Sequence, residues 1–114
     1  MLLDVRTYTC RPGTLKQHME LYARLGLAPQ KKCLGTPLAY MTTETGNPNQ
    51  YMHIWVYEDA GDREAKRAAL WADEEWLAYT RESAKLGALI NQENKLMNPV
   101  GFLPDPKGLH PGGG

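Results

Sequence analysis

The alternation of apolar and polar positions along the chain predicts four strands. The alternating segments also hold the β-branched and aromatic residues that strands favour, and they span residues 2–10, 33–44, 50–57 and 88–97. The strongest of these signals is that of 50–57. Residues 45–49 include Gly, Asn and Pro, which favour a turn, so we expect the two middle strands to form a hairpin.

Apolar residues recur at helical spacing between the strands. The first helical stripe begins at Leu15, and Gly26 and Pro29 are expected to end it. The second helical region follows the acidic residues 58–62, whose charges favour a helix N-terminus. Asp73 is expected to divide this region by capping a further helix.

The resulting order is β-α-β-β-α-β. This order predicts a ferredoxin-like subunit of the α+β class, with a four-stranded antiparallel sheet and its helices on one face. A length of 114 residues suits one domain. We expect that domain to span residues 1–104, and the Pro- and Gly-rich residues 105–114 to form a flexible tail.

Both faces of the strand at 50–57 are largely apolar, whereas a half-solvated antiparallel strand has one polar face. Met52, Ile54 and Val56 point to one side, and the side chains that point to the other are Tyr51, His53, Trp55 and Tyr57. The helices of a ferredoxin-like unit cover only one side of its sheet. We therefore predict that a second copy covers the other side in a homodimer; the alternative is that the tail or a loop folds over it.

Composition narrows the choice of partners. Lys plus Arg and Asp plus Glu each number 13, so the net charge is zero and provides no positive field for nucleic acid. No apolar run in the sequence is long enough to cross a bilayer, and its first residues lack a signal-peptide pattern. We expect neither nucleic acid nor a membrane as a partner. Cys10 and Cys33 are either reduced thiols of a cytoplasmic protein, which we favour, or one disulfide of a secreted protein.

The sequence has none of the familiar catalytic motifs, so candidate chemistry depends on side chains that share a strand face. His18, His53 and His110 lack the spacing of metal ligands, and we expect neither a metal nor a permanent cofactor. The polar and aromatic residues of the strands instead predict a small-molecule pocket, which has apolar walls and a few orienting polar groups.

The predicted catalytic residues of this pocket are His53 as general base or acid, Arg6 as the group that stabilises an anion, and Glu93 as an assisting donor or acceptor. The predicted substrate-binding residues are Tyr8, Trp55, Tyr57, Gln92 and Trp76. Each assignment has a structural alternative. His53 would then be a hydrogen-bonded core residue, Arg6 would form an ion pair with Glu93 on the neighbouring strand, and the tryptophans would anchor the core or an interface.

Several segments, taken in order, resemble the NIPSNAP family across residues 2–104. They are Val5–Tyr8 with Pro12–Gly13, Tyr51–Asp59 with Arg63 and Arg67–Leu70, Asp73–Trp76, and Asn91–Asn94. The resemblance implies a dimeric α/β-barrel, in which two ferredoxin-like subunits pack their sheets face to face. It also implies a relationship to cofactor-independent oxygenases, haem-degrading oxygenases, cyclases and lactone isomerases.

These observations lead to three hypotheses. The first is a small-molecule enzyme of secondary metabolism that performs an oxygenation, cyclisation or isomerisation without a permanent cofactor. The second is a non-enzymatic module that binds a metabolite or a protein. The third is haem binding, with His53 or His18 as the axial ligand.

Overall fold

The computed structural model describes residues 1–103, and the predicted tail at 105–114 lies outside the described residues. The elements, in chain order, are β1 (Leu2–Cys10), α1 (Leu15–Leu21), η1 (Tyr22–Gly26), α2 (Leu27–Leu34), β2 (Ala39–Thr42), β3 (Gln50–Tyr57), α3 (Ala60–Trp71), α4 (Glu74–Leu86) and β4 (Leu89–Met97). Within the described part of the chain, no helix combines the length and the apolar character needed to cross a membrane.

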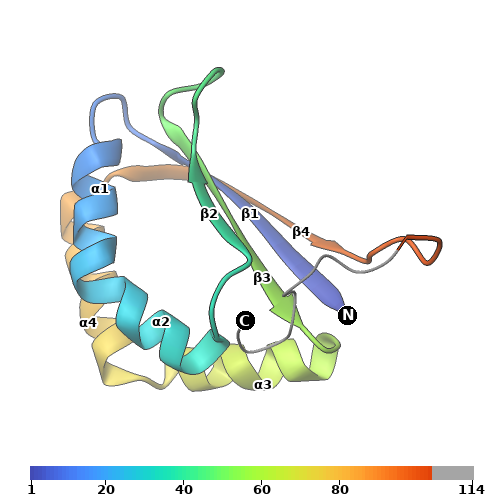
Figure 1. Ribbon diagram of the computed structural model, residues 1–114. Helices are drawn as coiled ribbons and strands as arrows, with labels where there is room; N and C mark the ends of the chain where they lie inside the picture. The colour runs from blue at the N-terminus through green and yellow to red at the C-terminus, as the bar shows by residue number, and fades with distance from the viewer. Residues whose placement is uncertain (104–114) are drawn as a thin grey trace.

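The four strands form one sheet in the order β2-β3-β1-β4. Every neighbouring pair is antiparallel. Figure 1 shows the helices together on one side of this sheet. The predicted α+β, ferredoxin-like subunit is therefore confirmed, including the second helical region in two parts, α3 and α4.

The prediction that Gly26 and Pro29 end the first helix is wrong. Helices α1, η1 and α2 follow one another without a break from Leu15 to Leu34. Element η1 is a π-helix, and Pro29 follows it in α2. As a consequence the second strand is shorter than predicted, because α2 uses the first part of the segment at 33–44.

Gly26 is buried where the π-helix passes the ring of Tyr79. A Cβ atom at this position would lie 2.8 Å from Cδ1 of Tyr22 and 3.1 Å from Cδ1 of Tyr79. Gly26→Ala is therefore expected to lower the free energy of unfolding by about 1–3 kcal/mol through overpacking, as measured by urea denaturation. The matched control is Gly61→Ala, whose Cβ would meet only an oxygen of Asp59 at 3.4 Å. Equal losses in the two variants would contradict the packing argument.

The helix-facing side of the sheet, called the inner face below, carries the core. Its larger cluster consists of Tyr22, Leu34, Trp55, Tyr57, Leu70, Trp76 and Tyr79. A smaller cluster consists of Cys10, Tyr51 and Ala88. The even-numbered residues from Asp4 to Tyr8 on β1 pair with the odd-numbered residues of β3, so this face also carries the polar side chains of β1.

The opposite side of the sheet, called the outer face below, is largely apolar on β2 and β3, carries charged residues on β4, and is not covered by any described helix (Figure 1). Val5 pairs with Ile54 on this face, and Met52 lies on the same side of β3 as Ile54. Met41 on β2 is 44% exposed. The sequence prediction of two largely apolar faces on β3 therefore agrees with the arrangement of the single chain.

Candidate functional site

A cavity of about 160 Å³ lies between the inner face of the sheet and the helices. All four strands contribute to its lining, together with η1, α2, α3 and α4. The aromatic side chains in its walls are Tyr8, Tyr22, Tyr40, Tyr51, Trp71, Trp76 and Tyr79. Among the described residues, no Asp or Glu lines it. Aromatic walls with a few polar groups are typical of a small-molecule site.

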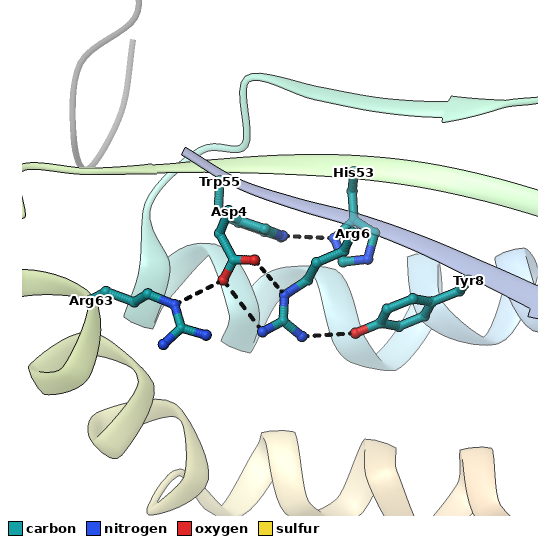
Figure 2. Close-up of polar contacts among 6 residues, drawn as sticks. All are labelled: Asp4, Arg6, Tyr8, His53, Trp55 and Arg63. Atoms are coloured by element: carbon teal, nitrogen blue, oxygen red, sulfur yellow. Dashed lines mark hydrogen bonds and ion pairs between the residues drawn. The ribbon is translucent and has the colours of Figure 1, made fainter. Parts of the chain in front are cut away.

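Arg6 enters this cavity from β1 and is held by its neighbours on the same strand face (Figure 2). Its Nε and Nη2 donate to the two oxygens of Asp4 at 3.1 and 3.3 Å, and its Nη1 donates to the hydroxyl of Tyr8 at 2.9 Å. Arg63 on α3 donates to the same carboxylate at 3.0 Å. Asp4 is fully buried, so it fixes the Arg6 guanidinium in a site largely shielded from water.

A third arginine, Arg67, lies one helical turn beyond Arg63 on α3 and lines the cavity. Burial, together with the charge of Arg6, lowers the pKa of Arg67. Asp4 is the only buried carboxylate among the described residues. Arg6 and Arg67 line this end of the cavity, and Arg63 and the one carboxylate, Asp4, lie beside it, which leaves an excess of positive charge.

His53 lies on β3 directly across from Arg6 and is 2% exposed. Its Nδ1 accepts a hydrogen bond from Nε1 of Trp55 at 2.6 Å, as Figure 2 shows. Its ring stacks on that of Tyr40, with 4.7 Å between the ring centroids, and meets Tyr8 edge-on at 4.9 Å. Its Nε2 is buried and has no hydrogen-bond partner among the described residues.

These contacts define the protonation state of His53. Burial, reinforced by the charge of Arg6, lowers its pKa to about 3, so the ring is neutral at neutral pH. An indole N–H can only donate, so Nδ1 must be the acceptor and the single ring proton is assigned to Nε2. The unpartnered nitrogen of His53 is therefore a hydrogen-bond donor and not a base.

The phenols around the cavity are also donors. Burial raises the pKa of Tyr22, Tyr40 and Tyr51 well above the ordinary value and that of Tyr79 to about 12. The hydroxyl of Tyr51 lies 2.7 Å from Nε2 of His18, whose own pKa burial lowers. At neutral pH these groups are uncharged, so the cavity contains positive charges and neutral hydrogen-bonding groups.

Neither a metal nor haem fits these residues. Within residues 1–103, no three His, Cys, Asp or Glu side chains come together as metal ligands. A cavity of about 160 Å³ matches a single aromatic ring and is far smaller than a porphyrin. The unpartnered Nε2 of His53 carries the ring proton, so it offers no lone pair to a metal.

The match to known proteins covers almost the whole described chain, because the NIPSNAP family model matches residues 3–104. The chain belongs to the NIPSNAP family. Protein Atu4242 of Agrobacterium tumefaciens is 32% identical, with a TM-score of 0.84 and coverage of 91% of this chain and 98% of that one. It is described as a NIPSNAP family protein with unknown function. A NIPSNAP-like domain protein of Burkholderia xenovorans is 34% identical, with a TM-score of 0.84 and coverage of 96% and 91%.

The fold of this chain is also similar to that of a protein with much lower sequence identity. An antibiotic biosynthesis monooxygenase is 19% identical, with a TM-score of 0.61 and coverage of 88% of this chain and 99% of that one. At this identity the likeness shows a common fold and nothing about the reaction. No curated protein is significantly similar to this chain.

The predicted site residues separate into two groups in this NIPSNAP structure. Those that line the cavity are Arg6, Tyr8, His53, Trp76 and Gln92. Trp55 and Tyr57 do not line it, because both are packed in the larger core cluster, where Trp55 holds the ring of His53. Trp55 therefore combines the predicted core role with the positioning of a cavity residue.

Glu93 lies apart from the site. It pairs with Thr7 on β1, whereas Arg6 pairs with Asn94, so Glu93 points to the outer face. Its side chain is 65% exposed, and the nearest cation is Lys95 at 3.8 Å. The alternative reading, an ion pair between Arg6 and Glu93, is therefore wrong, and Asp4 is the partner of Arg6.

Sequence reasoning missed Asp4, Tyr40 and the two arginines of α3. Asp4 could have been found, since it alternates with Arg6 and Tyr8 on one strand and so shares their face. Arg63 and Arg67 have helical i, i+4 spacing, but the same spacing occurs on solvated helix faces. Only the packing of α3 beside the start of β1 places Arg67 in the cavity lining and Arg63 on Asp4.

Proposed function

We propose that this NIPSNAP chain is an enzyme that oxygenates, cyclises or isomerises a small molecule of secondary metabolism without a permanent cofactor. The observation that carries the proposal is the buried, unpartnered Nε2 of His53, because His53 lines the aromatic cavity and pairs with Arg6 on the neighbouring strand. Reactions of these three classes can proceed through an enolate- or phenolate-like anion. Donors held in place before the reaction stabilise such an oxygen anion.

The side chains in and beside the cavity each have a definite part in this proposal. His53 donates from Nε2 to the developing oxygen anion, and Arg6 supplies positive charge to the same oxygen. Tyr8 and Trp55 position these two side chains. Trp76 and Gln92 line the remaining wall, where an aromatic surface and an amide orient a flat molecule.

Conversion of a substrate tests the proposal directly. The purified protein is incubated under air with a panel of single-ring phenols and enolisable acids, and the products are separated by chromatography and weighed by mass spectrometry. The expected result is a product whose rate of formation is proportional to the protein concentration. Binding of several compounds without conversion of any would contradict the proposal and favour a non-enzymatic binding module.

We further propose that two copies of the chain pair through their outer faces. Met52, Ile54 and Met41 lie on this apolar face, and burial of each such side chain contributes about 1.5–3 kcal/mol. A two-fold dimer buries the same patch on both copies. Light scattering at micromolar concentration is expected to give twice the mass of one chain, and a stable monomer would contradict the pairing.

Ile54→Asp is expected to abolish this dimer, because Ile54 lies on the outer face in the middle of the sheet, between β1 and β2. A charge buried between two sheets has no partner and costs several kcal/mol. Light scattering would then give the mass of a single chain. The control is Ala68→Asp on the exposed side of α3, which is expected to leave the mass of the dimer unchanged. A dimer that survives Ile54→Asp would place the interface elsewhere.

Cys10 and Cys33 support a proposal about the compartment. Both are free thiols, the first buried in the smaller core cluster and the second partly buried. Cysteines of this kind are common where glutathione keeps thiols reduced. We therefore propose a cytoplasmic location.

A further inference from the structure

The cavity supplies positive charge and hydrogen-bond donors but no base. Arg6 and Arg67 are the charged groups of its lining, and no carboxylate lines it within residues 1–103. His53 presents a donor because Trp55 occupies its other nitrogen. A neutral ligand that must lose a proton would find no described group to accept it.

The charges at this end of the cavity are not balanced by the protein. Asp4 binds Arg6 and Arg63, and no second buried carboxylate lies among the described residues. Arg67 has no ion pair or side-chain hydrogen bond within the described part of the chain, although it is only partly exposed. The hydroxyl of Tyr57, near the same arginines, is buried without a partner. A partly desolvated cation without a counter-ion is unfavourable, and an anionic ligand would relieve this cost.

The size of the cavity limits the ligand further. A protein cavity of about 150 Å³ binds benzene. The cavity here, at about 160 Å³, therefore matches one aromatic ring with a small substituent. Its walls are mainly aromatic side chains, which pack well against a flat ring.

We propose that this cavity binds a planar, single-ring molecule that enters as an anion, with its charged oxygen between Arg67, Arg6 and Nε2 of His53. The inference rests on the proposed function and names its substrate class. A carboxylate, a phenolate or a stable enolate would supply the same oxygen anion. The preformed charge also removes the need for a protein base in the reaction.

Three small ligands distinguish the effect of ligand charge on binding from the effect of ligand size. Benzoate has the proposed charge and size, benzamide has the same size without the charge, and 2-naphthoate has the charge with a second ring. Calorimetric titration of the intact protein is expected to show benzoate binding about tenfold or more tightly than either of the others. Equal affinity for benzamide, equal affinity for 2-naphthoate, or no binding of benzoate at millimolar concentration would each overturn the inference.

Arg67→Gln tests whether Arg67 binds the charged oxygen of the ligand. It is expected to weaken benzoate binding by about tenfold or more and to leave benzamide binding unchanged, since the lost interaction is with the charge. The control is Arg81→Gln on the exposed side of α4, which keeps full affinity. Unchanged benzoate affinity in a folded Arg67→Gln protein, judged by its circular dichroism, would overturn the assignment. Because these titrations involve no turnover, benzoate binding without conversion of any phenol would remove the enzyme and leave this inference intact.

Discussion

Asp4→Ala is expected to lower the free energy of unfolding by about 3–5 kcal/mol. The carboxylate of Asp4 is fully buried and bonds to both Arg6 and Arg63. Its removal leaves the guanidinium of Arg6, which is 6% exposed as a residue, without its counter-ion. Urea denaturation at a fixed protein concentration measures the loss, and the fixed concentration matters if the chain is a dimer.

The control for this prediction is a carboxylate in an exposed ion pair. Glu82 lies 3.3 Å from Lys85 on the surface of α4, and Glu82→Gln is expected to cost less than about 1 kcal/mol. Asp4→Asn keeps the shape of the side chain and one acceptor, so its effect is expected to lie between the two. A loss for Asp4→Ala as small as that for Glu82→Gln would show that the buried pair does not hold this end of the sheet.

His53→Asn is expected to lower turnover of a substrate found in the conversion screen by about tenfold or more. The amide oxygen of Asn occupies the position of Nδ1 and continues to accept from Trp55, whereas the donor at Nε2 is lost. The melting temperature is therefore expected to change little. His53→Ala is a poorer test, since it also leaves the buried indole N–H of Trp55 without an acceptor.

The matched variant is His53→Gln, whose amide nitrogen reaches the position of Nε2. It is expected to recover part of the activity that His53→Asn loses, because a donor is again present in the cavity. The order of rates, wild type above Gln above Asn, distinguishes a hydrogen-bond donor from a general base. Equal loss in both variants with unchanged stability would indicate that the imidazole moves a proton.

The order of the elements could be predicted because strand and helix periods differ clearly along this chain. The end of the first helix could not, since Gly26 and Pro29 are local signals for termination. The π-helix at Tyr22–Gly26 and the fit of Gly26 against Tyr79 come from tertiary packing. A window of neighbouring residues does not contain that contact.

The sequence predicts correctly which cavity residues share a face when they lie on the same strand. Arg6 and Tyr8 share a face by simple alternation, as do His53 and Tyr51, and all four line the cavity. Glu93 was misplaced because sequence does not set the register between β1 and β4. A shift of one residue moves a side chain to the other face of a sheet, and Asn94 is the residue that pairs with Arg6.

The proposed function of the cavity requires His53 to be a fixed, neutral donor, and the ¹⁵N chemical shifts of its imidazole test this without a substrate. With a pKa of about 3, the ring is expected to stay neutral from neutral pH down to about pH 5, with its proton on Nε2 throughout. Titration near the ordinary pKa of about 6.5, or a proton on Nδ1, would contradict it.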